Sequence, residues 1–160
     1  MIIGFSGYKL SGKTSAANFL QEKHAGIIQM VKEPLTGLYK YIMDKEYTKN
    51  DESREVLKVL GDAINKVNPS FLSSELDKNI EFHTYFVEHV YTDDIRDDNE
   101  AKAIKKHGGI IINIVREGFG SDGHRTEQGI SKHLVDYEIV HDTLDELYSE
   151  LDKIISEVKK

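Results

Sequence analysis

Residues 1–14 of the chain read MIIGFSGYKLSGKT, and this opening stretch carries the strongest structural signal in the sequence. The apolar run over residues 1–5 predicts a short buried strand, and residues 7–14 match the pattern G-x-x-x-x-G-K-[ST] in full. Apolar residues at helical spacing then follow as far as Phe19 and Leu20. A strand, a glycine-rich loop and a helix in this order are typical of a phosphate-binding loop.

The residue types in this loop suit the binding of a polyphosphate. Gly7 and Gly12 let the backbone approach the anion closely, and Lys13 supplies positive charge to the β- and γ-phosphates. The Thr14 hydroxyl can ligate Mg²⁺. Lys9 either points at phosphate or is a solvated loop lysine. The structural alternative for the whole pattern is a glycine-rich turn with a capping threonine.

The remaining chain alternates between expected strands and expected helices. Apolar runs predict strands over residues 26–30, 87–91, 110–115 and 135–140. Helices are expected from Glu33, over 54–67, over 72–82, from Asp97 or Asp98 to the Gly108–Gly109 pair, and from the Thr143–Glu146 capping box onward. Near-continuous apolar strands that alternate with helices predict an α/β fold, with about five parallel strands and helices on both faces.

Composition limits the classes of protein to which the chain can belong. Its 160 residues suit one compact domain, and the absence of cysteine excludes disulfides, thiolate zinc sites, iron–sulfur clusters and cysteine nucleophiles. A formal net charge of −7 argues against nonspecific binding to nucleic acid. The longest apolar runs, such as residues 109–115, are too short to cross a bilayer, and we recognise no targeting segment. These features fit a reducing, intracellular compartment.

A metal-assisted phosphate site also needs a carboxylate at the end of a neighbouring strand. Asp93 and Asp94 follow the expected strand over 87–91, and Arg96 lies two residues beyond. We expect Asp94 foremost, with Asp93 as the alternative, to lie near the metal, and Arg96 to hold a second phosphate. Ordinary strand-end or capping roles for the carboxylates, and pairing of Arg96 with the acidic run 97–100, are the structural alternatives.

Two further groups of basic residues are candidates for binding an anion. Arg54 and Lys58 lie one helical turn apart and so share a helix face, which can bind an anionic acceptor or simply be solvated. Arg116, His124 and Arg125 flank a glycine-rich loop whose composition suits a mobile cover over the site or an exposed loop. The seven histidines show no metal-ligand spacing, so we assign them no such role.

Several separated segments agree with one family. They are GYKLSGKT at 7–14, KEPLTGLYK at 32–40, SREVLKVLGD at 53–62, NPSF at 68–71, TDDIRDDNEA at 92–101, GGIIINIVR at 108–116, DGHRTE at 122–127 and DYEIVHDTLDELY at 136–148. With these segments in this order, the chain resembles the deoxynucleoside monophosphate kinases of bacteriophages, within the P-loop nucleotide kinases. The resemblance covers nearly the whole length, and the ordered set is more specific than the phosphate-binding loop alone.

The resemblance implies one three-layer P-loop kinase domain over residues 1–160, with a helical acceptor-binding region at 31–86 and a lid loop at 116–127. The implied catalytic residues are Lys13, Arg96, Asp94 and Arg125. Those implied for ATP are Gly7, Lys9, Ser11, Gly12, Lys13, Thr14, Ser15 and Arg116. Those implied for the acceptor are Glu33, Arg54, Lys58, Arg96, His124 and Glu127. Thr14 and Asp94 would bind Mg²⁺, with Ser15 as the alternative hydroxyl.

The chain departs from the family at a few positions. Family members often have Gln where Lys58 stands and Trp where Phe71 stands, so the contacts that select the base differ here. They also tend to place a basic residue after the Leu-Gly turn, where this chain has Asn65 and Lys66. The preferred base and sugar therefore stay open.

The activity implied by the resemblance is transfer of the γ-phosphoryl group of ATP, with Mg²⁺, to a (deoxy)nucleoside 5′-monophosphate. The resemblance also suggests a homodimer in the cytoplasm, that of the host if a phage encodes the chain, with no nucleic-acid or membrane partner. A kinase of another small acceptor, with Asp94 or Glu33 as base, is one alternative. A nucleotide-binding regulatory NTPase is another, although the chain lacks the guanine-recognition motif N-K-x-D.

Overall fold

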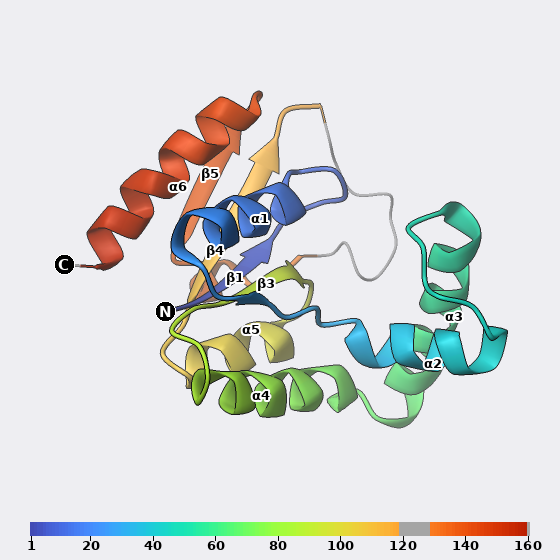
Figure 1. The fold of residues 1–160 in the computed structure, drawn as a ribbon. Coiled ribbons are helices and arrows are strands. Elements are labelled where there is room, and N and C mark those ends of the chain that lie inside the picture. The colour runs from blue at the N-terminus through green and yellow to red at the C-terminus, as the bar shows by residue number, and fades with distance from the viewer. Residues whose placement is uncertain (119–128, 160) are drawn as a thin grey trace.

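The computed structural model of the chain describes residues 1–118 and 129–159. Within these residues the strands form one parallel sheet in the order β2-β3-β1-β4-β5 (Figure 1). The strands are β1 (Ile2–Ser6), β2 (Ile27–Ile28), β3 (Val90–Ile95), β4 (Ile110–Arg116) and β5 (Tyr137–His141). The predicted α/β fold with a five-stranded parallel sheet is confirmed.

The helices follow the predicted order with small shifts in their limits. They are α1 (Lys13–His24), α2 (Glu33–Met43), α3 (Asp51–Val67), α4 (Phe71–Thr84), α5 (Asp98–Lys106) and α6 (Leu144–Val158). A short 3-10 helix at Lys132–Leu134 is not indicated by any sequence pattern. Helix α3 begins before the predicted position because the Asn50 side chain accepts a hydrogen bond from the backbone N–H of Ser53 at 2.8 Å.

Strand β3 differs from the prediction at both ends. It begins at Val90 and continues through Asp93 and Asp94 to Ile95, so the two carboxylates belong to the strand and do not follow it. The polar pair stays in the strand because β1 pairs with β3 as far as this end, across a shift in register. The sheet therefore fixes the direction in which each carboxylate points.

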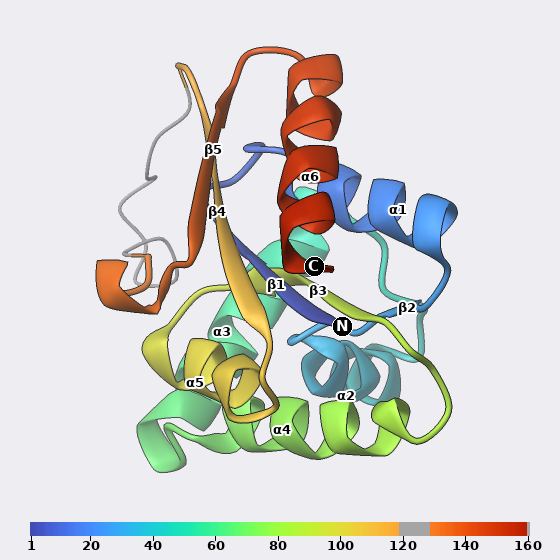
Figure 2. The same cartoon turned by 90° about the vertical axis from the view of Figure 1, so that its left-hand side faces the viewer.

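Helices cover both faces of the sheet and make three layers (Figure 2). Helices α1 and α6 pack on one face, over a buried core that includes Phe5, Leu20 and Leu151. Helix α5, backed by α4, packs on the other face over a core that includes Ile80 and Ile104. Within the described residues, we find no helix with both the length and the apolar composition that a membrane span requires.

Helices α2 and α3 pack on each other around a small core of their own, made by Leu35, Tyr39 and Leu57. They lie to the right of the sheet in Figure 1, inside the region 31–86 for which the resemblance implies a role in acceptor binding. The carboxyl ends of parallel strands meet at one edge, which is where ligands bind in such sheets. The residues that end or follow β1, β3, β4 and β5 therefore share this edge.

Candidate active site

The loop between β1 and α1 has a shape that favours glycine at two positions. Gly7 has a φ of 136°, and a Cβ there would lie 2.2 Å from the carbonyl oxygen of Ile114. Gly12 has a φ of 105°, and a Cβ there would lie 3.2 Å from the ring of His141. The two glycines thus let the loop lie against β4 and β5 just before the start of α1, the helix end that attracts anions.

The first side chains of α1 connect this loop to its surroundings. Lys13 Nζ donates hydrogen bonds to the carbonyl oxygens of Gly7 and Tyr8, at 2.8 and 2.7 Å. The ammonium group therefore lies beside the loop, where it can meet the negative charge of a polyphosphate. Thr14 Oγ1 donates a hydrogen bond to Asp93 Oδ2 at 3.0 Å, which ties the helix start to β3.

The oxygen atoms of Thr14 and Asp93 fit a magnesium ion. Asp93 is 5% exposed, and its Oδ1 has no hydrogen-bond partner in the part of the chain that the structure describes. A buried carboxylate oxygen without a partner is destabilising, and a cation would relieve this. The described residues contain no cluster of three or more His, Asp or Glu ligands, so such an ion would need further oxygen ligands from a bound phosphate or from water.

Asp94 lies next to Asp93 but has different partners. Arg96 Nε donates a hydrogen bond to Asp94 Oδ1 at 2.8 Å, and Lys32 Nζ lies 3.7 Å from Oδ2. Burial alone would raise the pKa of Asp94, but the charges of Arg96, Lys32 and Lys13 outweigh burial and hold this pKa below its usual value. Asp94 is therefore an ionised carboxylate that keeps two cations at the centre of the site.

A second buried carboxyl fixes the turn after β3. Glu100 is 4% exposed, and its Oε2 accepts hydrogen bonds from the backbone N–H groups of Arg96 and Asp97, at 2.6 and 3.3 Å. Asp97 accepts in return from the backbone N–H of Glu100, which completes a capping box at the start of α5. Burial, together with the negative charges of Asp97 and Asp94, raises the pKa of Glu100 to about 8. A largely neutral carboxyl thus positions the backbone of Arg96.

His141, at the end of β5, supports the phosphate-binding loop from behind. Its ring is 3% exposed, with Nε2 2.8 Å from the carbonyl oxygen of Ser11 and Nδ1 3.1 Å from that of Thr143. The imidazole therefore links the loop to the start of α6. Sequence analysis misses this contact because 130 positions separate Ser11 from His141, and only the strand order brings them together.

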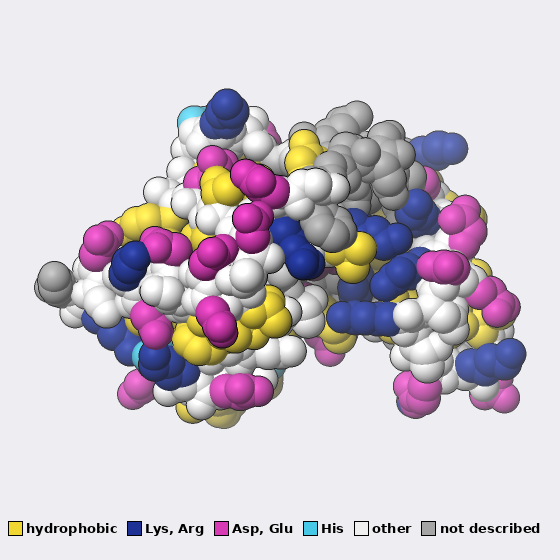
Figure 3. Space-filling model, turned by 90° about the horizontal axis from the view of Figure 1, so that it is seen from above, with side chains coloured by type: hydrophobic (Ala, Val, Ile, Leu, Met, Phe, Trp, Pro, Cys, Tyr) yellow, Lys and Arg dark blue, Asp and Glu magenta, His cyan; other side chains and the backbone are white. Residues whose placement is uncertain are grey.

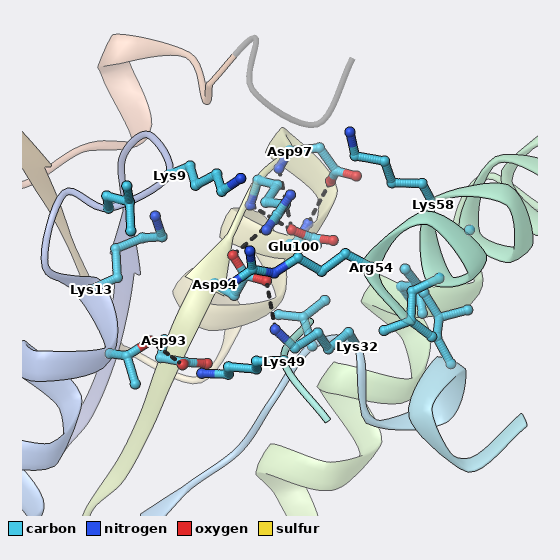
Figure 4. Close-up of a pocket in the computed structure, with 18 of the residues that line it drawn as sticks. Lys9, Lys13, Lys32, Lys49, Arg54, Lys58, Asp93, Asp94, Asp97 and Glu100 are labelled. Carbon is cyan, nitrogen blue, oxygen red and sulfur yellow. Dashed lines mark hydrogen bonds and ion pairs between the residues drawn. The ribbon is translucent and has the colours of Figure 1, made fainter. Parts of the chain in front are cut away.

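A cleft of about 750 Å³ separates the phosphate-binding loop from α3. Lys9 and Lys13 line it from the loop, and Arg54 and Lys58 line it from α3, so cations face the cleft from both sides (Figure 4). Figure 3 shows Lys and Arg side chains gathered around this hollow, while acidic side chains are common elsewhere on the same face. Because the chain has a net charge of −7, an anion can be attracted only by a local group of cations. The walls of this cleft provide such a group.

Most of the predicted site residues line this cleft. They are Lys9, Gly12, Lys13, Thr14, Ser15, Arg54, Lys58, Asp94, Arg96 and Arg116. Gly7 and Ser11 belong to the same loop and hold its shape through their contacts with β4 and β5. Glu33 instead begins α2, where its carboxylate accepts a hydrogen bond from the Gln29 side chain.

His124, Arg125 and Glu127 lie outside the described residues. Lys32, Lys49 and Glu100 also line the cleft, and sequence analysis misses all three. The D-x-x-E spacing from Asp97 to Glu100 is a capping-box signal that identifies Glu100. The two lysines carry no such signal, because each lies in a short connection near the start of a helix.

Comparisons with known proteins bear on the fold. None of the protein-family models matches the chain. The chain is 26% identical over 181 aligned residues, 94% of each protein, to a protein of Acanthamoeba polyphaga mimivirus that is provisionally named a deoxynucleotide monophosphate kinase. It superposes with a TM-score of 0.56 on the crystal structure of a sugar kinase from Janibacter sp. HTCC2649, at 12% identity and over 99% of this chain and 94% of that one. The chain therefore has the fold of P-loop kinases.

Proposed function

We propose that this chain is a kinase that transfers the γ-phosphoryl group of ATP to the phosphate of a (deoxy)nucleoside 5′-monophosphate. The observation that carries the proposal is the presence of basic side chains on both walls of one cleft. The phosphate-binding loop supplies Lys13 on one side, and α3 supplies Arg54 and Lys58 on the other. Two phosphorylated ligands that meet end to end would each find cations there.

A phosphate acceptor suits these side chains better than a hydroxyl acceptor. A hydroxyl group needs a base that takes its proton. Asp94 is held between Arg96 and Lys32 with a lowered pKa, which makes it a weak base. Glu33 is engaged with Gln29 at the start of α2, and Glu100 accepts hydrogen bonds from the backbone of the turn after β3. An acceptor phosphate is already ionised and needs only cations that orient it.

In the proposed reaction, an oxygen of the acceptor phosphate attacks the γ-phosphorus of ATP. The bond from that phosphorus to the β–γ bridging oxygen breaks, and ADP leaves with the electron pair. Lys13 holds the β- and γ-phosphates of the donor, while Arg54 and Lys58 hold the acceptor phosphate. Because no proton has to move, catalysis rests on in-line positioning and on neutralising the charge of the transferring group.

Arg96 is proposed to neutralise charge on the phosphoryl group as it is transferred. Its guanidinium is oriented by Asp94 and its backbone by Glu100, so the cation is preorganised for this role. Mg²⁺, when bound, supplies further neutralisation of phosphate charge, and Thr14 and Asp93 would hold it.

The similarity to the mimivirus protein supports the choice of acceptor. The alignment spans nearly all of both chains, and the provisional name of that protein specifies a deoxynucleotide monophosphate. The fold is shared with a sugar kinase and does not select an acceptor. The choice of a nucleotide therefore rests on this similarity and on the charges of the cleft.

A panel of acceptors tests the proposal. Purified protein is incubated with Mg-ATP and, separately, with each common ribonucleoside and deoxyribonucleoside monophosphate, and ADP and nucleoside diphosphate are measured together. We expect the two products in equal amounts from at least one nucleotide. Small sugars and sugar acids in the same panel should yield no phosphorylated product.

Two lysine variants serve as controls for the panel. Lys13→Ala should lower turnover on the order of 100-fold or more, because it removes charge at the transferring group. Lys23→Ala changes the far end of the same helix, where Lys23 pairs with Asp152, and should keep full activity. ADP without any diphosphate would indicate an NTPase, and phosphorylation of a sugar alone would indicate another acceptor. Either result contradicts the proposal.

A further inference from the structure

Gly61 occupies the interior of α3, a position where glycine destabilises a helix relative to alanine. Neither crowding nor backbone conformation explains it. A Cβ built on Gly61 would meet only Leu35 Cδ1 among the described residues, at the ordinary contact distance of 3.5 Å, and the backbone is helical. The protein itself thus has room for a side chain here.

The space that the missing side chain leaves belongs to the cleft. Gly61 lines the cleft, and so does Leu35 on the facing helix α2. On α3, Lys58 lies one turn before Gly61 and Asn65 one turn after it, and both line the same cleft. Gly61 therefore forms a flat place in the middle of a wall that is otherwise covered by side chains.

The order of residues along this wall matches the order of groups in a nucleotide. The cations Arg54 and Lys58 occupy the first half of α3, Gly61 comes next, and the amides of Asn65 and Asn68 lie at its end. The axial rise from Arg54 to Gly61 is about 10 Å in a regular helix. A phosphate, a sugar and a polar-edged base follow one another in the same direction.

We propose that Gly61 is a specificity-determining residue that makes room for the base of the acceptor nucleotide, an inference that rests on the proposed function. The flat ring lies on the bare backbone at Gly61, with Leu35 beside it. Asn65 and Asn68 lie where they can donate to and accept from the polar edge of the base. A methyl group at position 61 takes up the space of the ring without disturbing the protein.

Two matched glycine-to-alanine substitutions separate this role from a structural one. Gly61→Ala adds a methyl group in the cleft wall. Gly37→Ala makes the same change in the neighbouring helix α2, at an exposed position where a Cβ meets nothing within 4 Å among the described residues. We expect both variants to fold, with melting temperatures that are unchanged or raised by about 1–3 °C, because alanine favours the helix.

Kinetics with the best nucleotide of the acceptor panel then give the decisive comparison. Gly61→Ala should raise the KM of that nucleotide by about tenfold or more, while the KM of ATP changes by less than about twofold. Ribose 5-phosphate, which has the phosphate and the sugar but no base, should inhibit wild type and Gly61→Ala with equal constants. Gly37→Ala should match the wild type in the KM of the nucleotide, the KM of ATP and the inhibition constant of ribose 5-phosphate.

Other results would overturn the inference. A nucleotide KM that Gly61→Ala leaves unchanged would show that no group of the acceptor needs this space. If Gly61→Ala weakened inhibition by ribose 5-phosphate as much as it raised the KM of the nucleotide, the sugar or phosphate would occupy this space instead of the base. Failure of the proposed function looks different, because the wild type itself would then form no nucleoside diphosphate in the panel, and the inference would fall with its premise.

Discussion

Asp93 and Asp94 are adjacent, yet they contact different parts of the site. Successive residues of a strand point to opposite faces of the sheet, so Asp93 reaches Thr14 of α1 while Asp94 reaches Lys32 and Arg96. One carboxylate keeps an oxygen that can receive a metal, and the other neutralises two cations. The two acids therefore have separate roles in the proposed reaction.

Asp93→Asn tests the first of these roles. Asparagine can still accept the hydrogen bond from Thr14, but the substitution removes the negative charge that would hold Mg²⁺. We expect kcat to fall on the order of 100-fold and the Mg²⁺ concentration for half-maximal activity to rise, measured by titrating Mg²⁺ at saturating nucleotides.

The control for this change is Asp152→Asn, which alters an exposed ion pair with Lys23 and should leave the Mg²⁺ requirement unchanged. Asp94→Asn provides the opposing test. If Asp94→Asn raises the Mg²⁺ requirement and Asp93→Asn does not, the metal belongs to Asp94, the residue that the sequence favours.

The start of α5 depends on a carboxyl group that titrates at an unusual pH. The pKa of Glu100 is raised to about 8 by burial and by the neighbouring charges of Asp97 and Asp94, against 4.5 for an ordinary glutamate. Between these values the folded protein binds more protons than the unfolded chain, so the contribution of Glu100 to stability falls as the pH rises. Below about pH 4.5 Glu100 is protonated in both states, and its contribution is then constant.

Glu100→Gln should remove this dependence. Glutamine is neutral at every pH and can still accept the backbone hydrogen bonds of Arg96 and Asp97. We expect the free energy of unfolding of the variant, relative to wild type, to increase from about pH 5 to pH 8.5, measured by urea denaturation. Glu150→Gln, which changes an exposed pair with Lys153, should show the same pH dependence of the free energy of unfolding as the wild type.

Activity of the same variant separates a positioning role from catalysis by Glu100. A pKa near 8 also suits a general base, and Glu100 lines the cleft. If Glu100 only positions Arg96, Glu100→Gln should keep most of the wild-type kcat, and its kcat should vary little with pH near neutrality. A large loss of kcat with no loss of stability would instead identify Glu100 as a base and favour a hydroxyl acceptor.

The end of β5 offers a second test of support for the site. His141→Ala removes the ring that lies between the carbonyl oxygens of Ser11 and Thr143. We expect the KM of ATP to rise about tenfold and the protein to lose about 1–3 kcal/mol of stability, because the loop loses a buried hydrogen-bond partner. His133→Ala, in the exposed part of the 3-10 helix, is the matched control. An unchanged KM for ATP in His141→Ala would contradict the role in supporting the loop.

The sequence predicts those parts of the fold that depend on residues close together in the chain. The pattern at 7–14, the buried strand at 110–115 and the capping box at 143–146 each depend on neighbouring residues, and the structure contains all three. Contacts between distant segments leave no such signal. The order of strands sets the contact of His141 with Ser11, and the alternation of β3 decides which aspartate meets Thr14.

The distribution of charge over the molecule also depends on contacts between distant segments. Composition gives the net charge of −7 and nothing about its arrangement. Periodicity places Arg54 and Lys58 on one helix face, and only the packing of α2 and α3 beyond the strand ends turns that face toward Lys13. Lys32 and Lys49 join them from connections whose positions depend on the folded chain.

The chemical position of the transferred phosphorus tests the central claim most directly. Mg-ATP and the best nucleotide of the panel are incubated with the protein, and the product is followed by ³¹P nuclear magnetic resonance. We expect a new phosphoanhydride, with coupled α- and β-phosphorus signals from the diphosphate of the acceptor nucleoside in addition to those of the donor's ADP. Lys13→Ala should form this product more slowly, on the order of 100-fold. A new phosphate ester, or inorganic phosphate alone, would contradict transfer to an acceptor phosphate.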